Sequence, residues 1–307
     1  MRIAIIGGGG IGGYLAAMLA QKEQDVTLIA RGSHLLAMTR KGLHLKRQDP
    51  LCDIRPRLKL TAMPAKLDAE VVLVCVKMTD LESVAQQLST ILTARSLILP
   101  VQNGVEAHAI LSQHLPEHDV GKGTAHISAR IVEPGVVTLD GRLARFFFSA
   151  PTQTANGGET LAAFARIAEK ADVTVSIEKD DSMERLLWHK FIFLTAFSGL
   201  TTALRVPLGV IRAHPSGLSL FYQAMCETES VAKAQGKTFP QSPSEQWRER
   251  LASMPESYRA SMSLDAERNK PLELPWLSAA VVRMGEAHSI ETPVHTFITT
   301  MLTLPRA

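Results

Sequence analysis

The first half of the chain alternates short apolar runs with amphipathic segments, a pattern typical of a parallel α/β sheet with helical crossovers. The strand candidates are nearly continuous in apolar residues, as expected for strands covered on both faces. They are Arg2–Ile6, Val26–Ile29, Val71–Val76 and Ser96–Val101. Segments with helical spacing follow them, at Ile11–Gln21, Leu35–Lys41, Leu81–Leu92 and Val105–Leu111. We therefore expect an open α/β domain in this half.

The pattern changes after residue 120. Gly121–Ala150 is rich in Val, Ile, Phe and Gly and carries turn signals at Pro134-Gly135 and Asp140-Gly141. We expect antiparallel strands there that extend the sheet, with Val173–Ile177 as the final strand. Helical periodicity dominates beyond Lys179, in Met183–Leu204, Ser216–Gln235, Pro243–Met254 and Leu277–His288. The predicted division is an α/β domain over residues 1–180 and an all-helical domain over residues 181–307.

Composition and charge agree with a two-domain globular protein. The 307 residues are 46% hydrophobic and 21% charged, and the net charge is only +3. So weak a charge indicates neither a nucleic-acid nor a membrane partner. The cysteines, Cys52, Cys75 and Cys226, match neither a zinc site nor a disulfide framework, which favours a reducing compartment. We expect a cytoplasmic protein. The ten histidines lack ligand partners at metal-binding spacing, and no metal is expected.

A glycine-rich turn follows the first predicted strand and precedes a helix. This is the context that a G-x-G-x-x-G motif needs to bind a dinucleotide, and it predicts a Rossmann-type domain. We expect Gly7 to allow the tight turn, Gly9 to admit the pyrophosphate and Gly12 to let helix and strand pack closely. Gly10 and Ile11 complete the predicted cofactor-binding turn. The glycine run also permits a frame shifted by one residue, with Gly8, Gly10 and Gly13.

The residue at the end of the second predicted strand bears on the choice of cofactor. NAD-binding versions usually place an acidic residue there, which accepts hydrogen bonds from the ribose 2′-hydroxyl. Here the strand ends in Arg31, whereas Asp25 precedes the strand. A guanidinium pairs with a 2′-phosphate through charge-assisted hydrogen bonds. The sequence predicts NADP(H), with a solvated loop arginine as the alternative.

Polar residues also follow the third and fourth strands. Lys77 and Asn103 stand where ligands bind in open α/β sheets, outside the carboxyl ends of the strands. Asn103 can both donate and accept hydrogen bonds, toward a cofactor ribose or a substrate carbonyl. A simple turn at Asn103-Gly104 and a surface charge at Lys77 remain equally open.

One lysine lies among large apolar residues in the second half. Lys190 stands in the run Leu186–Leu194, and burial lowers a lysine pKa, which suits the group to donate a proton near neutrality. Such a donor is required when a ketone is reduced, because the carbonyl oxygen must gain a proton. The neighbouring residues alone favour the alternative, a lysine whose stem packs while its head reaches water.

Taken together, these residues resemble the ketopantoate reductase (2-dehydropantoate 2-reductase) family, nearly end to end. The resemblance rests on IAIIGGGGIGGY, DVTLIARG, VCVK ending at Lys77, PVQNG around Asn103, WHK ending at Lys190, and SM at Ser261 followed by Glu273. It implies an NADPH-dependent reduction of a 2-oxo acid. Lys190 would be the general acid and Glu273 its partner and a substrate contact, Ser261 would bind the substrate carboxylate, and Asn103 would lie near the reacting carbonyl.

The chain departs from the family at its expected substrate site. Leu194 and Ser198 stand where the family has asparagines, on the same helix face as Lys190, and Asp80 replaces a glutamine. Leu194 cannot make the hydrogen bonds of an asparagine. The expected function is reduction of 2-dehydropantoate to pantoate, between a Rossmann-type and a helical domain. The alternatives are reduction of a more apolar 2-oxo acid and a catalytically weakened NADP(H)-binding regulatory protein. A homodimer is also expected.

Overall fold

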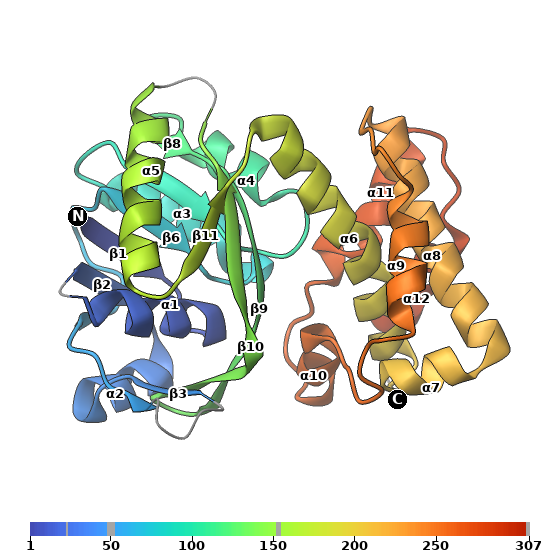
Figure 1. Cartoon of the computed structure of the whole chain (residues 1–307), viewed down its shortest axis with the longest axis horizontal. Coiled ribbons are helices and arrows are strands. Elements are labelled where there is room, and N and C mark those ends of the chain that lie inside the picture. The colour runs from blue at the N-terminus through green and yellow to red at the C-terminus, as the bar shows by residue number, and fades with distance from the viewer. Residues whose placement is uncertain (23, 48–52, 152–154, 305–307) are drawn as a thin grey trace. The chain divides into compact units, whose positions relative to one another are not determined.

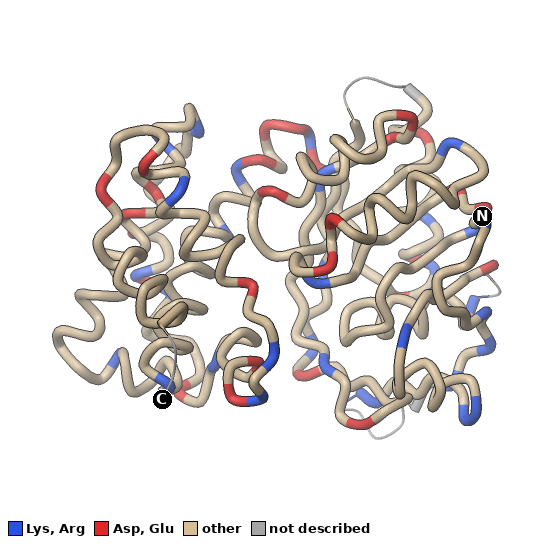
Figure 2. Tube along the Cα trace, turned by 180° about the vertical axis from the view of Figure 1, so that it is seen from behind, with Lys and Arg blue, Asp and Glu red and all other residues tan. Residues whose placement is uncertain are grey.

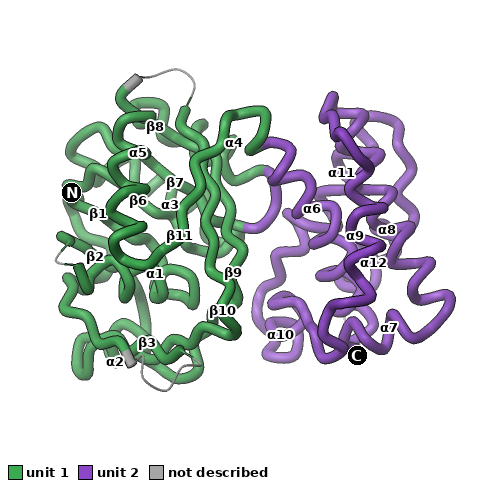
Figure 3. The backbone as a smooth tube through the Cα atoms, viewed as in Figure 1, with its two compact units in different colours: residues 1–102, 106–183 green, residues 103–105, 184–307 purple. Residues whose placement is uncertain are grey.

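A computed structural model describes residues 1–22, 24–47, 53–151 and 155–304. The described chain divides into two compact units (Figure 3). The first contains residues 1–102 and 106–183, and the second contains residues 103–105 and 184–307. In the structure the boundary follows residue 183, whereas the sequence predicts it after residue 180. Residues 103–105 form part of the second unit, although they follow the fourth predicted strand.

The first unit is built on a six-stranded parallel sheet, of which β1, β2, β6 and β8 are labelled in Figure 1. The strand order is β5-β2-β1-β6-β7-β8. Its strands are β1 (Arg2–Ile6), β2 (Asp25–Ile29), β5 (Lys59–Thr61), β6 (Val71–Val74), β7 (Leu97–Pro100) and β8 (Asp119–Val120). Its helices are α1 (Gly10–Ala20), α2 (Gly32–Lys41), α3 (Met78–Ile91) and α4 (Ala107–His114). The predicted parallel sheet is confirmed. Strands β5 and β8 have only three and two residues, too few to give an apolar pattern.

A second sheet corrects the prediction for residues 121–150. The hairpin of β9 (Lys122–Glu133) and β10 (Val136–Ser149) forms around the predicted Pro134-Gly135 turn, but it does not extend the first sheet. With β3 (His44–Arg47), β4 (Asp53–Ile54) and β11 (Thr174–Ile177) it makes a five-stranded sheet. Asp140-Gly141 lies inside β10, where the register shifts.

The reason for two sheets lies in helix α1, which contacts strands of both. Every residue from Gly12 to Ala20 is buried, so the helix is apolar on all sides and needs cover on each. The second sheet supplies that cover. Tyr14 of α1 stacks on Phe146 of β10, with ring centroids 6.3 Å apart. Helix α5 (Ala155–Lys170) also belongs to this unit, and its Phe164 contacts Phe148.

The second unit is helical, as predicted. It contains α6 (Asp180–Ala203, of which residues 184–203 belong to this unit), α7 (Leu208–Ala213), α8 (Pro215–Ala234), α9 (Pro243–Leu251), α10 (Ser261–Glu267), α11 (Ser278–Ala287) and α12 (Pro293–Thr303). The short 3₁₀ helix η1 covers Leu274–Trp276. The sequence analysis identified α6, α8, α9 and α11 and missed the others. None of the described helices is long and apolar enough to cross a membrane.

Acidic and basic residues occur in both units, as the charged positions in Figure 2 show.

In the second unit several polar side chains are also buried. Glu227 of α8 accepts hydrogen bonds from the backbone N–H groups of Val294 and His295, at 3.0 and 3.1 Å. The carboxylate thereby satisfies donors in the first turn of α12, which have no partner within their own helix.

Candidate active site

The glycine turn has the geometry that dinucleotide binding needs. Gly7 directly follows β1 and has φ of 106°, a left-handed conformation that favours glycine. A Cβ at Gly12 would lie 1.9 Å from the carbonyl oxygen of Gly7, so only glycine lets the helix approach the turn. A Cβ at Gly9 would meet nothing within 4 Å. The chain therefore turns tightly at Gly7, and helix α1 packs closely against this turn at Gly12.

The first turn of α1 is held against the second sheet. A Cβ at Gly10 would lie 2.1 Å from the carbonyl oxygen of Ala129 in β9. Ile11 is partly buried and packs against the core of the first unit. Gly10 and Ile11 therefore position the N-terminus of α1, whose free N–H groups make it a ready anion-binding site.

A hollow of about 380 Å³ opens beside this turn, within the first unit. Gly7 and Gly9 line it at the end of β1, Arg31 after β2, and Lys77 after β6. The structure therefore brings four of the predicted cofactor-binding residues to one place at the carboxyl ends of three parallel strands. Lys77 is the exposed N-cap residue of α3. Asn103 is not among the residues that line this hollow, and it belongs to the second unit.

Arg31 has a partner that the sequence analysis did not find. Its Nη2 donates a hydrogen bond to Oδ2 of Asp80 at 2.7 Å. Asp80 lies in the first turn of α3 and also lines the hollow. The two residues are 49 positions apart in the sequence, in separate strand-helix units, so no local pattern relates them.

Two other titratable groups line the hollow and are neutral near pH 7. Burial raises the pKa of the Cys75 thiol well above its usual value, so the group is neither a thiolate nor a nucleophile. Burial also lowers the pKa of His34, although the Gly8 backbone acts in the opposite direction. The Nδ1 atom of His34 accepts a hydrogen bond from the N–H of Gly135 at 2.9 Å. The charged side chains of the hollow are thus Arg31, Lys77 and Asp80.

The second unit holds the predicted proton donor. Lys190 lies in α6 between buried aromatic residues, and its side chain is partly buried. Burial lowers the Lys190 pKa from 10.5 to about 8, while the carboxylate of Glu273 acts in the opposite direction. The neighbouring His189 bonds Gln246 at 3.0 Å and so faces a different partner. A lysine in this setting exchanges a proton readily near neutral pH.

Glu273 is buried directly before η1, with only 7% of its surface exposed. The segment of Asn103 lies against the same element, because a Cβ at Gly104 would be 3.1 Å from the carbonyl oxygen of Trp276. Asn103, Lys190 and Glu273 therefore belong to one unit. The structure brings Lys190 and Glu273 into electrostatic contact, although they come from distant parts of the sequence.

The remaining predicted substrate residues lie on α6 and α10. Leu194 and Ser198 follow Lys190 on α6 by about one and two turns; Leu194 is partly buried and Ser198 is buried. Ser261 is the exposed first residue of α10. That helix is attached to α6 by Ser263, whose hydroxyl donates to the carbonyl oxygen of Thr201 at 3.2 Å.

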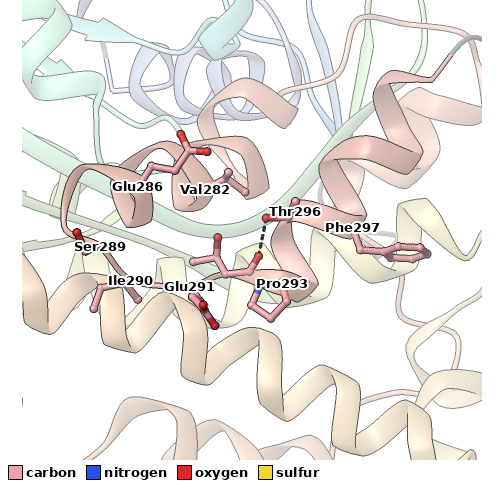
Figure 4. Close-up of a pocket in the computed structure, with 9 residues that line it drawn as sticks. Val282, Glu286, Ser289, Ile290, Glu291, Pro293, Thr296 and Phe297 are labelled. Carbon is pink, nitrogen blue, oxygen red and sulfur yellow. Dashed lines mark hydrogen bonds between the residues drawn. The ribbon is translucent and has the colours of Figure 1, made fainter.

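A second hollow, of about 660 Å³, lies in the second unit between α11 and α12 (Figure 4). Glu286, Glu291 and Phe297 are among its lining residues, and the Thr296 hydroxyl donates to the carbonyl oxygen of Thr292 at its edge. None of the predicted site residues lines it. In the part of the chain that the structure describes, no three histidine, cysteine or acidic side chains are grouped to hold a metal ion.

A glycine turn at the carboxyl end of an interior strand of a parallel sheet, with a lysine–glutamate pair in a helical unit, is typical of a dinucleotide-dependent oxidoreductase. The family comparison agrees with this class. Residues 3–152 match the family model described as ketopantoate reductase PanE/ApbA, and residues 182–305 match the model of its C-terminal part. The chain belongs to the ketopantoate reductase PanE/ApbA family and is an oxidoreductase that acts on a CH–OH group.

Individual relatives cover almost the whole chain. A 2-dehydropantoate 2-reductase from Halobacterium salinarum is 29% identical over 299 residues, 96% of this chain and 95% of the relative. A PanE/ApbA family ketopantoate reductase from Ralstonia eutropha is 28% identical, with a TM-score of 0.88 over 98% of this chain and 97% of that one. A D-mandelate dehydrogenase with NADH and anilino(oxo)acetate shares the fold, with a TM-score of 0.88 over 98% of this chain and 97% of that one, at 18% identity.

Proposed function

We propose that this protein reduces a 2-oxo acid to a 2-hydroxy acid with NADPH, and that its substrate is 2-dehydropantoate. The observation that carries the proposal is the Lys190–Glu273 pair. It is a proton donor whose pKa is lowered to about 8, with a carboxylate beside it, in a chain of the ketopantoate reductase family. The relatives that bear the name 2-dehydropantoate 2-reductase support this choice of substrate.

The hollow of the first unit fits a dinucleotide. Its wall has no side chain at Gly9, so a pyrophosphate can approach the backbone, and the N–H groups of the first turn of α1 favour an anion there. We assign the 2′-phosphate to Arg31 and the neighbouring part of the nucleotide to Lys77. When bound, the nicotinamide cofactor supplies the hydride.

The residues of the second unit supply the proton. Reduction adds a hydride to the carbonyl carbon of the substrate and a proton to its oxygen. Lys190 donates that proton from Nζ as the oxygen gains negative charge. Glu273 keeps the lysine protonated, because its carboxylate favours the charged form. Asn103 hydrogen-bonds the reacting carbonyl, and Ser261 bonds the substrate carboxylate.

A second substrate class is favoured by one observation. Leu194, one turn from Lys190, is partly buried and offers apolar contact where an asparagine would offer hydrogen bonds. Such a site favours a 2-oxo acid with an apolar tail, since a hydroxyl without a partner loses about 1–3 kcal/mol of binding free energy. The ratio of kcat/KM for 2-dehydropantoate to that for a branched aliphatic 2-oxo acid distinguishes the two substrates.

The test is oxidation of NADPH by the purified protein with a panel of 2-oxo acids that includes 2-dehydropantoate. We expect turnover, and a Lys190→Ala variant should lose at least about 100-fold in kcat while it still binds NADPH. The control Lys170→Ala changes an exposed lysine at the end of α5 and should keep the wild-type rate. A protein that binds NADPH but oxidises none, with or without Lys190, is a nucleotide-binding regulator instead.

A further inference from the structure

The hollow of the first unit contains an acidic group beside the cation assigned to the 2′-phosphate. Arg31 donates to Asp80 at 2.7 Å, and both residues line the hollow. We propose that Asp80 sets the cofactor preference of this enzyme: its carboxylate weakens the binding of NADPH and lets NADH bind in the same hollow. This inference rests on the proposed function, since it concerns the nucleotide of the same reaction.

The carboxylate opposes a 2′-phosphate in two ways. It occupies the guanidinium of Arg31, which a phosphate would need, and it places a negative charge close to a group that itself carries about −1.5 to −2. Both effects act only on the phosphorylated nucleotide. A free 2′-hydroxyl is a hydrogen-bond donor, and a carboxylate is its usual acceptor in NAD-binding folds. Asp80 thus supplies the acidic group that the end of β2 lacks.

The geometry makes Asp80 the fixed member of the pair. The Asp80 side chain is 32% exposed and lies in the first turn of α3, where the helix dipole favours a negative charge. The Arg31 side chain is 82% exposed and is free to turn. Exposed ion pairs are weak, so Arg31 can leave Asp80 for a phosphate. The expected result is a reduced preference for NADPH rather than its loss.

The experiment compares Asp80→Asn with the wild type in the full-length protein. Calorimetric titrations with 2′,5′-ADP and with 5′-AMP measure the two forms of the nucleotide without turnover. We expect Asp80→Asn to bind 2′,5′-ADP about five- to tenfold more tightly and 5′-AMP no more tightly. The KM values for NADPH and NADH should shift in the same directions. Arg31→Ala should move the ratio of the two affinities the opposite way.

Two controls isolate the position and the charge. Glu82→Gln removes a carboxylate from the same helix, but Glu82 is exposed and does not line the hollow, so the affinity ratio should stay at the wild-type value. Asp80→Glu keeps the charge and should keep the ratio within about threefold. An Asp80→Glu variant that behaves like Asp80→Asn overturns the proposal that charge is the cause.

The outcomes separate this inference from the proposed function. If wild-type protein binds nucleotides and Asp80→Asn leaves the ratio unchanged, the role of Asp80 is overturned and the reductase proposal stands. If neither 2′,5′-ADP nor NADPH binds at millimolar concentration, both are overturned. The inference is also overturned if the affinity ratio of 2′,5′-ADP to 5′-AMP is as large in the wild type as in Asp80→Asn.

Discussion

The two units hold their functional residues in place by different means. In the first unit, the turn beside β1 is shaped by glycines whose missing side chains allow backbone to touch backbone. In the second, the chemistry comes from side chains on separate helices, and polar groups are buried among them. The acidic and histidine side chains buried there are Glu227, Glu229, Asp265, Glu273 and His295, whereas Asp119 is the one buried acidic or histidine side chain among the described positions of the first unit.

This difference determines what disturbs each unit. An added methyl group is enough to break a close backbone contact, because packed interiors have no spare volume. An added or lost proton matters more where polar groups are buried, since burial penalises the charged form. We therefore expect the first unit to be sensitive to volume at single glycines and the second to be sensitive to pH.

The largest effect is expected from Gly12→Ala. The new Cβ would lie 1.9 Å from the carbonyl oxygen of Gly7, so α1 must move away from the turn. We expect a loss of about 3 kcal/mol in the free energy of unfolding and at least a 100-fold loss in nucleotide affinity. Urea denaturation and calorimetric titration with 2′,5′-ADP measure the two quantities.

Two matched glycine-to-alanine substitutions separate the effect on folding from the effect on nucleotide binding. Gly158→Ala in α5 places a Cβ 4.0 Å from its nearest neighbour and should stabilise the helix by about 0.5–1 kcal/mol. Gly9→Ala meets no protein atom within 4 Å, so it should fold normally and yet bind nucleotide poorly, because the methyl group points where the pyrophosphate is expected. Equal stability of Gly12→Ala and the wild type would show that α1 does not depend on this contact.

The glycine turn was predictable from sequence because it is local. Strand, turn and helix are contiguous there, and each glycine has a separate steric reason that the structure reproduces at Gly7 and Gly12. The second sheet was not predictable in the same way. The hairpin pattern of residues 121–150 fixes antiparallel strands but not the sheet that they join, and that depends on α1 being apolar on all sides.

The same distinction between local patterns and distant contacts applies to the site residues. The Arg31–Asp80 pair and the Lys190–Glu273 pair join residues from distant parts of the sequence, and periodicity contains no information on such contacts. For Lys190 the neighbouring residues alone favoured a head group in water. The resemblance to a known family pointed instead to a proton donor. Burial and the lowered pKa agree with that role.

A smaller effect is expected on the stability of the second unit when the pH falls. Burial lowers the His295 pKa to about 4, and Nε2 of this residue lies 2.9 Å from both the Thr228 hydroxyl and the carbonyl oxygen of Ala224. Between pH 6.5 and 4 the unfolded chain binds a proton at this residue and the folded chain does not. Stability is therefore lost as pH falls through this range, by about 2 kcal/mol at pH 5 relative to pH 7.

The His295→Gln variant isolates this contribution. Glutamine does not titrate, so the difference in unfolding free energy between wild type and variant should shrink as pH falls from 7 to 5. Glu227, whose pKa burial raises, titrates with the opposite sign in both proteins and cancels in the difference. His288→Gln, at an exposed position after α11, should leave the pH dependence unchanged. Parallel curves for wild type and His295→Gln would exclude His295 as the source.

The smallest effect is expected in the pH dependence of kcat/KM, which depends on the protonation of Lys190. Reduction needs the protonated lysine, so kcat/KM should be constant below a pH of about 8 and fall about tenfold per unit above it. In Glu273→Gln the carboxylate that raises the lysine pKa is gone, and the inflection should move to lower pH. Glu286→Gln, an exposed change on α11, should leave it in place. An inflection that stays fixed in Glu273→Gln would mean that Glu273 contacts the substrate without acting on Lys190.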